Sequence, residues 1–354
     1  ADMALTLARP QGNGPGGKGL AMFYLELRDE TGALNNLRVE RLKDKLGTRK
    51  VPTAELILDG TLAEPVAGLD NGVRNISPML TITRTWNSVC AVAGMQRGLS
   101  LAADYARRRI AFGRPLAEQP LHRATLAAQQ AELEAGFQLT FELVDWLDRS
   151  EGGSLDTGQA AGLRLLTALV KLTTGKQGVA VASEVLEAFG GAGYVEDTGL
   201  PLLLRDAQVL PIWEGTTNVL SLEVLKAASA AGALSSIEQR LQQARSRLSD
   251  PALADAAGRA AQVASKAVNW LTTARPETVE AAARHFALTL GRSLALALAC
   301  EHGQWSLDHL GDRRSLACAL VFSRSCIDVL GTFPGDEAGA CFGDNPGSPD
   351  ALRA

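Results

Sequence analysis

Hydrophobic and polar residues alternate in short stretches over the first 70 residues, as is typical of half-buried β-strands. The alternation predicts strands at residues 3–8, 20–27 and 54–59, with a shorter one around 37–39. A glycine-rich loop over 11–19 joins the first two strands. Its lysine is followed by neither a Ser or Thr nor a helix, which a phosphate-binding loop would need. The loop is therefore interpreted as a hairpin connection.

The pattern changes at about residue 77, where apolar residues begin to recur every three or four positions. This period predicts helices at 77–108, 121–149, 157–190, 202–210 and 217–228. Long helices joined by loops of moderate length are typical of a four-helix bundle. We therefore expect an α+β chain that is mostly α, with a partial β-domain over residues 1–76 and a helical bundle over 77–230.

Residues 231–331 show the helical period again. Their apolar spacing predicts helices at 237–248, 263–275, 279–300 and 315–330. We expect an additional helical domain here, separate from the bundle. Residues 332–354 are rich in Gly, Pro and Asp and are expected to form a flexible tail.

Composition and charge narrow the classes of function. The chain of 354 residues is 46% hydrophobic and 21% charged, which allows a sizeable core. Its formal net charge of −4 argues against a main role in coating nucleic acid or an anionic membrane. The longest apolar run, Leu294–Cys300, is too short to span a bilayer. Five cysteines, an odd number without CxxC spacing, are typical of a reduced, cytoplasmic protein without a structural zinc site.

Histidine offers no metal site either. His302 and His309 lie seven residues apart and could share one helix face. No third ligand has a suitable spacing, so capping or solvated roles are expected for them. The sequence also lacks a convincing Ser-His-Asp arrangement.

Four segments carry a more specific signal. They are Arg41–Arg49, Tyr105–Gly113, Glu187–Tyr194, and Arg205–Ala207 leading to Ile212–Asn218. In this order and spacing they resemble the acyl-CoA dehydrogenase family over about residues 1–228. The basic segment at 41–49 and the Trp-Glu-Gly sequence at 213–215 are most similar to its AidB-like (adaptive-response) branch.

The resemblance implies a domain arrangement. The family has a helical N-terminal domain, a middle β-domain and a C-terminal helical bundle, and this chain matches part of the second and all of the third. The chain also opens inside a predicted strand, without an initiator Met. We therefore expect a fragment that lacks the N-terminal domain and part of the middle domain. The family pattern further implies a homotetramer whose FAD sites are completed across subunits.

Glu214 matches the catalytic base of the family. Dehydrogenation of an acyl-CoA thioester needs a base for the weakly acidic α-proton while a hydride leaves the β-carbon for the flavin. A carboxylate in an apolar setting is a competent base, and Leu210–Trp213 supplies such a setting. From the pattern alone, however, Glu214 or Thr216 ahead of an apolar helix would be interpreted as an N-cap.

Several residues match family positions that contact FAD. An Arg at 109 suits a pyrophosphate because its guanidinium binds two phosphate oxygens at once, although Arg107–Arg109 could equally be a solvated helix end. The turn at 190–193 also fits a helix C-cap. Glu187 departs from the Gln that the family often has, and an ionised carboxylate would repel a pyrophosphate. The implied cofactor set is Arg109, Phe112, Gln119, Glu187, Gly190, Gly191, Thr216 and Asn218.

Three residues match family positions at the acyl-CoA substrate: Arg84, Gly215 and Lys226. Gly215 lets a substrate approach the backbone closely. At the position of Thr81, family members that are specific for the length of the acyl chain often have Asp. This difference indicates that the protein is less adapted to ordinary acyl-CoA substrates.

The resemblance therefore implies an FAD-dependent oxidoreductase that carries out the α,β-dehydrogenation of an acyl-CoA. An electron-transferring flavoprotein is its candidate electron acceptor. The alternative is an AidB-type flavoprotein of the DNA-damage (alkylation) response with weak or vestigial dehydrogenase activity. A third interpretation is a bundle that serves as a scaffold and has lost catalysis.

Charge weighs against nucleic acid as a partner, although the AidB-like branch allows it. Residues 227–354 hold 12 Lys plus Arg and 13 Asp plus Glu, a net charge of −1. Phosphate neutralisation dominates non-specific affinity for DNA, and this segment has no excess of positive charge to supply it. Arg240, Arg245 and Arg247 could form a local basic stripe but are more simply the solvated face of an amphipathic helix.

Overall fold

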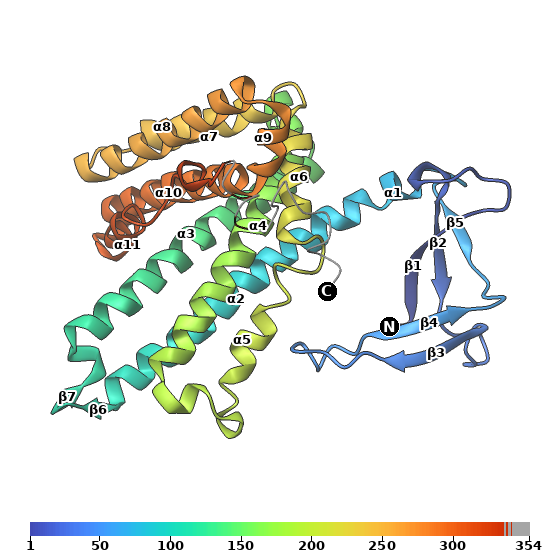
Figure 1. The fold of residues 1–354 in the computed structure, drawn as a ribbon, viewed down its shortest axis with the longest axis horizontal. Helices are drawn as coiled ribbons and strands as arrows, with labels where there is room; N and C mark the ends of the chain where they lie inside the picture. The colour runs from blue at the N-terminus through green and yellow to red at the C-terminus, as the bar shows by residue number, and fades with distance from the viewer. Residues whose placement is uncertain (336–337, 339–340, 342–354) are drawn as a thin grey trace. The chain divides into compact units, whose positions relative to one another are not determined.

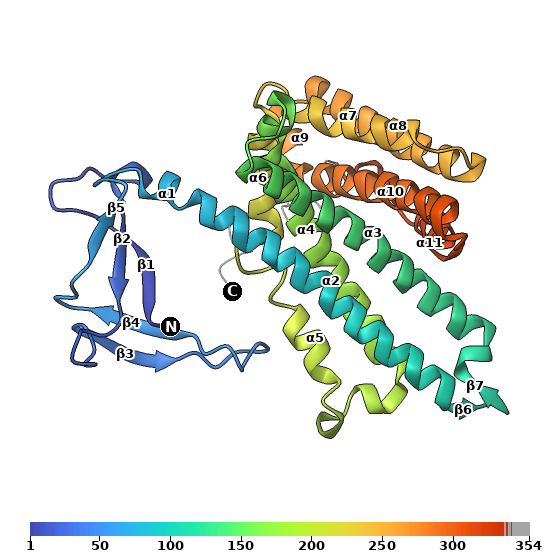
Figure 2. The same ribbon diagram turned by 180° about the vertical axis from the view of Figure 1, so that it is seen from behind.

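The computed structural model describes residues 1–335, 338 and 341. It divides into two compact units after Arg84, which Figures 1 and 2 show from opposite sides. The fold is mostly helical with a small β-rich unit at the N-terminal end of the chain, as the sequence predicts. The predicted tail at 332–354 lies almost entirely outside the described residues.

The first unit contains two small antiparallel sheets. Strand β1 (Met3–Ala8) pairs with β2 (Ala21–Glu26), and β2 pairs with β5 (Glu64–Val66). The second sheet joins β3 (Leu37–Leu42) to β4 (Ala54–Leu58). The glycine-rich loop connects β1 to β2, which confirms the hairpin interpretation.

The short helix α1 (Gly72–Asn75) lies against strand β2. A side chain at Gly72 would collide with the backbone there, because a Cβ atom would lie 2.6 Å from the carbonyl carbon of Ala21. Glycine is thus required at this close approach. Ala21 and Leu25 of β2 are buried in this unit.

Three helices of 32 residues each form the frame of the second unit. They are α2 (Ser77–Arg108), which starts in the first unit, α3 (Pro120–Glu151) and α4 (Thr157–Ala188). Asp156 caps α4 by accepting a hydrogen bond from the backbone N–H of Gln159 at 2.7 Å, and the Gln159 side chain completes a capping box. Pro120 stands at the first turn of α3, where its missing N–H costs no hydrogen bond.

Shorter helices complete the bundle and extend it. They are α5 (Pro201–Ala207), α6 (Thr217–Ala228), α7 (Ala233–Ser246), α8 (Pro251–Thr273), α9 (Pro276–Ala281), α10 (Ala283–Leu310) and α11 (Arg314–Phe322). The bounds predicted after residue 231 differ from the structure. The helix predicted at 237–248 is α7, which begins at Ala233, and the helix predicted at 263–275 is α8, which begins at Pro251. The helix predicted at 279–300 is two helices broken at Ala282, and the helix predicted at 315–330 ends at Phe322.

The early end of α11 has a physical cause. The Arg292 guanidinium on α10 donates a hydrogen bond to the carbonyl of Cys326 at 2.8 Å, and the Thr289 hydroxyl accepts one from the backbone N–H of Leu330 at 2.8 Å. Both bonds draw the chain after α11 back along α10. These contacts satisfy backbone groups that a continued helix would have paired internally.

Helix α4 is the centre of the second unit. Its middle is buried on all sides, with Leu165, Leu166, Leu169 and Leu172 fully inaccessible. A helix that is apolar all round packs inside a protein rather than on its surface. In Figures 1 and 2, α4 runs between α2, α3 and the C-terminal helices, and it packs on α3, α6, α7 and α10.

The helices after residue 231 do not form a core of their own, in contrast to the separate domain expected from the sequence. One continuous hydrophobic cluster joins residues of α3, α4 and α6 to residues of α7, α8, α10 and α11. The reason is that α10 is also buried through its middle, at Leu294–Cys300, and must be covered on several sides. It packs on α8 and α11 as well as on α3 and α4.

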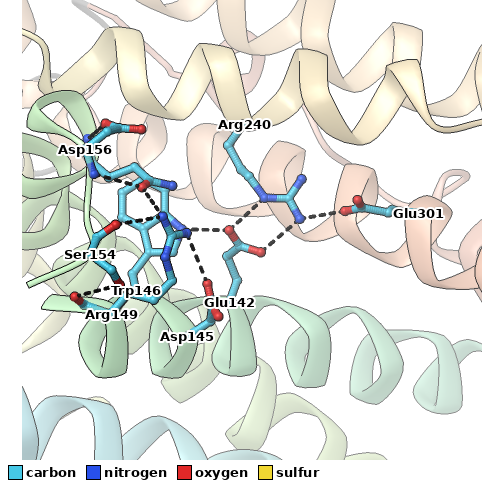
Figure 3. A network of polar contacts seen from close by, with 9 residues as sticks. Glu142, Asp145, Trp146, Arg149, Ser154, Asp156, Arg240 and Glu301 are labelled. Carbon is cyan, nitrogen blue, oxygen red and sulfur yellow. Dashed lines mark hydrogen bonds and ion pairs between the residues drawn. The ribbon is translucent and has the colours of Figure 1, made fainter. Parts of the chain in front are cut away.

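A buried ionic network ties α7 to α3 and α10 (Figure 3). The Arg240 guanidinium donates hydrogen bonds to Glu142 at 2.7 Å and to Glu301 at 2.5 Å. Glu142 also accepts a hydrogen bond at 2.8 Å from the indole of the fully buried Trp146. Burial acts to lower the pKa of Arg240, but the hydrogen bonds and charges of the two glutamates outweigh it and the pKa is raised.

The ionic network corrects the expectation that Arg240 lies on the solvated face of α7. The side chain of Arg240 is only 12% exposed, and Arg247 forms an ion pair with Glu301. Arg245 and Arg247 are both exposed, as expected of a solvated face, so Arg240 is the residue that departs from the prediction. A basic stripe is therefore not presented on this helix.

Among the described residues, no single helix is both long and apolar enough to cross a membrane. Helices α6 and α7 together reach that length and composition, but they are bent by 94° where they meet.

The cysteines differ widely in accessibility. Burial raises the pKa of Cys300 to about 12 and also raises the pKa of Cys318, whereas Cys326 is exposed. Since the thiolate is the nucleophile, we expect iodoacetamide at pH 8 to label Cys326 in the native protein while Cys300 and Cys318 stay unmodified. Mass spectrometry of tryptic peptides measures this, with the denatured protein as the control. Labelling of Cys300 at the rate of Cys326 would contradict the packing of α10.

Candidate active site

Glu214 lies in the turn between α5 and α6, in an unusual backbone conformation. Its φ angle is 57°, and Gly215 after it has a φ of 107°. A residue with a side chain costs about 1–3 kcal/mol in such a region and stays there only when its surroundings hold it. The Glu214 side chain is half-buried, next to the partly exposed apolar residues Ile212 and Trp213.

Helix α6 begins directly after this turn. Thr216, rather than Glu214, is its N-cap, and the Thr216 hydroxyl accepts a hydrogen bond from the backbone N–H of Val219 at 3.5 Å. Thr216 and Asn218 are exposed at this end of the helix. The unpaired N–H groups and the helix dipole make the end suited to anionic or hydrogen-bond-accepting ligands.

A buried lysine on α4 supports the turn that contains Glu214. Lys171 on α4 is fully inaccessible, and its ammonium donates a hydrogen bond to the carbonyl of Gly215 at 2.7 Å. The sequence contains a signal for it, because Lys171 interrupts the apolar run Leu165–Leu172. A buried lysine needs partners, but the run alone could not indicate which backbone group supplies one.

Asn87 on α2 holds the same turn from another side. Its amide nitrogen donates a hydrogen bond to the carbonyl of Leu210 at 3.2 Å, and its amide oxygen accepts one from the indole of Trp213. Gly175 on α4 lets the turn lie close, since a Cβ there would be 3.2 Å from the Leu210 carbonyl oxygen. None of these supports was predicted from the sequence.

A second group of predicted residues lies between α2 and α3. The short strands β6 (Ile110–Ala111) and β7 (Arg114–Pro115) form a hairpin whose two turn residues, Phe112 and Gly113, both have positive φ. This is the geometry of a two-residue hairpin loop. The hairpin places the Phe112 ring in solvent, 96% exposed, and Arg109 is exposed beside it.

Gln119 supports this hairpin rather than pointing freely outward. Its side-chain amide donates a hydrogen bond to the carbonyl of Ala111 at 3.1 Å. The residue is half-buried just before α3. Its observed role is thus to fix the position of the loop that carries Phe112.

The glycine turn, Gly190–Gly193, follows the C-terminus of α4 and lies at the same end of the bundle as the β6–β7 hairpin. Gly190 has a φ of 59° and follows the C-cap Phe189, which confirms the C-cap interpretation. The rings of Phe189 and Tyr105 on α2 are in contact, with centroids 4.9 Å apart. Glu187 is exposed in the last turn of α4, so all six cofactor candidates from 109 to 191 belong to this end.

Two glycines in this turn differ sharply in the space around them. A Cβ at Gly193 would lie 2.0 Å from the carbonyl oxygen of Leu186, while a Cβ at Gly191 would meet open space. We expect Gly193→Ala to lower the free energy of unfolding by about 1–3 kcal/mol because the α4 C-terminus must shift. Gly191→Ala, the matched control, should change it by less than about 0.5 kcal/mol. Urea unfolding followed by circular dichroism compares the two, and equal losses would contradict the geometry.

The structure separates the predicted cofactor residues into two groups. The Glu214 turn contacts Lys171, whereas the glycine turn begins after Ala188. Seventeen residues of α4 separate these positions, which corresponds to about 25 Å at the rise of an α-helix. One copy of the chain therefore does not bring Arg109, Gly190 and Thr216 around one point.

The substrate candidates are distributed in a similar way. Gly215 belongs to the Glu214 turn, and Lys226 is exposed in the last turn of α6. Arg84 lies on α2 within the first unit and is half-buried. Among the described residues, no cluster of His, Cys, Asp or Glu is arranged to hold a metal ion.

The fold, the Trp-Glu-Gly turn and the glycine turn define a class of protein. Residues 70–229 match the family described as "Acyl-CoA dehydrogenase, C-terminal domain". The chain belongs to the acyl-CoA dehydrogenase family.

Individual relatives agree with this assignment. Acyl-CoA dehydrogenase family member 11 of Caenorhabditis elegans is 44% identical over 316 residues, covering 85% of this chain and 51% of that protein. The putative acyl-CoA dehydrogenase AidB of Escherichia coli is 35% identical over 226 residues, covering 64% and 40%. The crystal structure of Caenorhabditis elegans ACDH-11 in complex with C11-CoA superimposes with a TM-score of 0.86 at 38% identity, covering 98% of this chain and 61% of that one. The chain spans about half the length of the curated relatives it matches.

Proposed function

We propose that this chain is the flavin- and acyl-CoA-binding part of an FAD-dependent acyl-CoA dehydrogenase in which Glu214 is the catalytic base. The carboxylate takes the proton from the α-carbon of the thioester. A bound FAD would supply the two-electron acceptor for the hydride that leaves the β-carbon, so that a carbon–carbon double bond would remain. A carboxylate suits the first step because it can accept a proton without help from a metal.

The observation that carries the proposal is the supported conformation of Glu214. A strained residue at the entrance of a helix, held by contacts on both sides, is characteristic of a functional site. The resemblance of the segment 212–218 to the family's motif supports the same role, because it matches Glu214 to the family's catalytic base. The half-buried carboxylate next to Trp213 and Ile212 gives the partly apolar surroundings that favour proton abstraction.

The residues present fit an FAD that is shared between copies of the chain. Arg109 offers an exposed guanidinium for a pyrophosphate, Phe112 an exposed ring, and Gly190 with Gly191 a surface free of side-chain contacts. Thr216 and Asn218 offer hydrogen-bonding groups at the start of α6. Since these two groups lie about 25 Å apart along α4, we propose that each cofactor is held by two subunits of a homotetramer. Glu187 adds a negative charge near the first group, so it is the least suitable of the cofactor candidates.

An acyl-CoA is the substrate class that fits best. The cations of Arg84 and Lys226 are suited to the phosphates of CoA, and ACDH-11 of Caenorhabditis elegans has been solved with C11-CoA. An electron-transferring flavoprotein is the proposed acceptor of the electrons.

The test is the absorbance spectrum of the protein purified with added FAD. A bound flavin that loses its absorbance under anaerobic conditions on titration with short, branched or long acyl-CoAs supports the proposal. A protein that stays colourless, or a flavin that no acyl-CoA reduces, would refute it.

An AidB-type role in the DNA-damage response is the second candidate function. The 35% identity to the Escherichia coli protein favours it. The ion pairs of Arg240 and Arg247 weigh against it, because they remove two cations from the basic stripe that DNA would contact. A gel-shift titration with duplex DNA from low to physiological salt decides between the two. Absence of a shift even at low salt would exclude this role.

A further inference from the structure

The backbone around Glu214 is fixed at the residue before it and at the residue after it. The indole N–H of Trp213 donates a hydrogen bond to the amide oxygen of Asn87, and the carbonyl of Gly215 accepts one from Lys171 at 2.7 Å. Glu214 lies between these two anchors with a φ of 57°. Rotation of its backbone would have to break one of the two hydrogen bonds.

The two anchors come from elements that cannot follow the turn if it moves. Asn87 lies on α2 and is 2% exposed, and Lys171 lies on the buried face of α4 and is fully inaccessible. Gly175 and Gly178 of α4 leave room for Leu210, so the turn lies directly on the helix. Within the turn, the backbone N–H groups of Ile212 and Trp213 also donate hydrogen bonds to the carbonyl of Val209. The turn is therefore held by two long helices in addition to its own local hydrogen bonds.

The side-chain amide of Asn87 provides both the hydrogen-bond donor and the acceptor that this position requires. One side of the amide accepts the hydrogen bond from Trp213, while the other donates to the carbonyl of Leu210 at 3.2 Å. An Asp would keep the acceptor and lose the donor, and a Leu of similar size would lose both. The Leu210 carbonyl and the Trp213 indole would then be left without these partners near a buried helix face.

We propose that Asn87 is a positioning residue for Glu214: with Lys171 it forms a clamp that holds the left-handed conformation from which the carboxylate reaches the substrate. The inference rests on the proposed function. A clamp of this kind acts on the reaction rate rather than on binding, since displacement of a catalytic group by about 1 Å is enough to slow a reaction by roughly 100-fold.

Single-turnover reduction of the flavin by a saturating acyl-CoA is the measurement that tests the clamp. Asn87→Leu should lower the rate constant about 10- to 100-fold, while the acyl-CoA concentration at half saturation and the FAD content stay within about twofold. Asn87→Asp should fall between Asn87→Leu and wild type. Trp213→Phe removes the indole donor, and the double variant Asn87→Leu/Trp213→Phe should be no slower than Asn87→Leu because both changes remove the same contact.

Thr140→Val is the matched control for loss of stability. Its buried hydroxyl bonds within α3, to the carbonyl of Gly136 at 2.8 Å, and does not touch the turn. This variant should lower the melting temperature without changing the reduction rate by more than about twofold, as expected for a buried group with no part in positioning. Lys171→Met tests the other half of the clamp; if it does not fold, the Asn87 and Trp213 variants still decide.

Two outcomes would overturn the inference alone: an active wild type whose Asn87→Leu variant reduces at the wild-type rate, or variant effects that multiply in the double variant. A wild type whose bound flavin no acyl-CoA reduces would overturn the proposed function and the inference with it. That failure is seen without any variant, so the two cases are distinguishable.

Discussion

Glu214→Gln is expected to lower the rate of flavin reduction by acyl-CoA by about 1,000-fold, within the 10²–10⁴ range typical of a general base. Gln is nearly the same size as Glu and keeps an oxygen that can accept hydrogen bonds, but it has no carboxylate to take the α-proton. Lys171 and Asn87 support the turn through hydrogen bonds to the backbone carbonyls of Gly215 and Leu210, which the substitution keeps. The variant should therefore fold and bind FAD as the wild type does.

The experiment compares anaerobic reduction in a stopped-flow instrument with FAD content measured from the absorbance of the same samples. Glu277→Gln on α9 is the control, because it makes the same chemical change at an exposed carboxylate outside the turn. It should reduce at the wild-type rate. If Glu214→Gln also reduces at that rate, the base lies elsewhere and the scaffold interpretation of the bundle gains support.

Arg240→Ala is expected to lower the free energy of unfolding by about 3–5 kcal/mol. The substitution removes the cation and leaves the carboxylate of Glu142, which is 12% exposed, with only the indole of Trp146 as its partner. Glu301, which is 15% exposed, loses one of its two cations and keeps the ion pair with Arg247. The cost of a buried, uncompensated charge is the reason that breaking such a pair destabilises far more than an exposed pair does. Figure 3 shows Arg240 joined to both Glu142 and Glu301. Because these residues lie on α7, α3 and α10, we expect the loss to loosen the three helices together.

Urea unfolding at pH 7, followed by far-ultraviolet circular dichroism, measures this difference. The control is Arg108→Ala, which removes an exposed ion pair to Asp104 one turn earlier on α2. Exposed pairs contribute up to about 1 kcal/mol, so the control should change stability little. A loss below about 1 kcal/mol for Arg240→Ala would mean that the carboxylates rehydrate and that the network does not hold α7 in place.

The helical period predicted the bundle well because its signal is local. The helices expected at 77–108 and 217–228 have those bounds in the structure. The break at Ala282 was missed because the apolar period continues across it. The shared core was missed for a related reason: periodicity shows that a helix such as α10 has an apolar face but does not show which helix covers it.

Only the residues of the candidate site that belong to recognisable sequence motifs were predicted. Glu214, Thr216 and the glycine turn could be located because they lie in recognisable segments. Asn87 and Lys171 lie inside long helices, and their partners are 126 and 44 residues away along the chain. No local pattern encodes such contacts. The distance between the two groups of cofactor candidates along α4 was not predicted either. Matching single residues to family positions gives no distance between those residues.

The continuous core has a consequence for how this protein can be divided. In the sequence, residues 231–331 look like a separate domain that could be removed. In the structure, however, α10 covers apolar faces of α3 and α4 that would be exposed without it. A chain cut after residue 230 would expose these faces to water, and an apolar surface of that kind promotes aggregation. The C-terminal helices are thus inseparable from the part of the protein that carries Glu214. An evolutionary loss of these helices would require compensating changes on α4 itself.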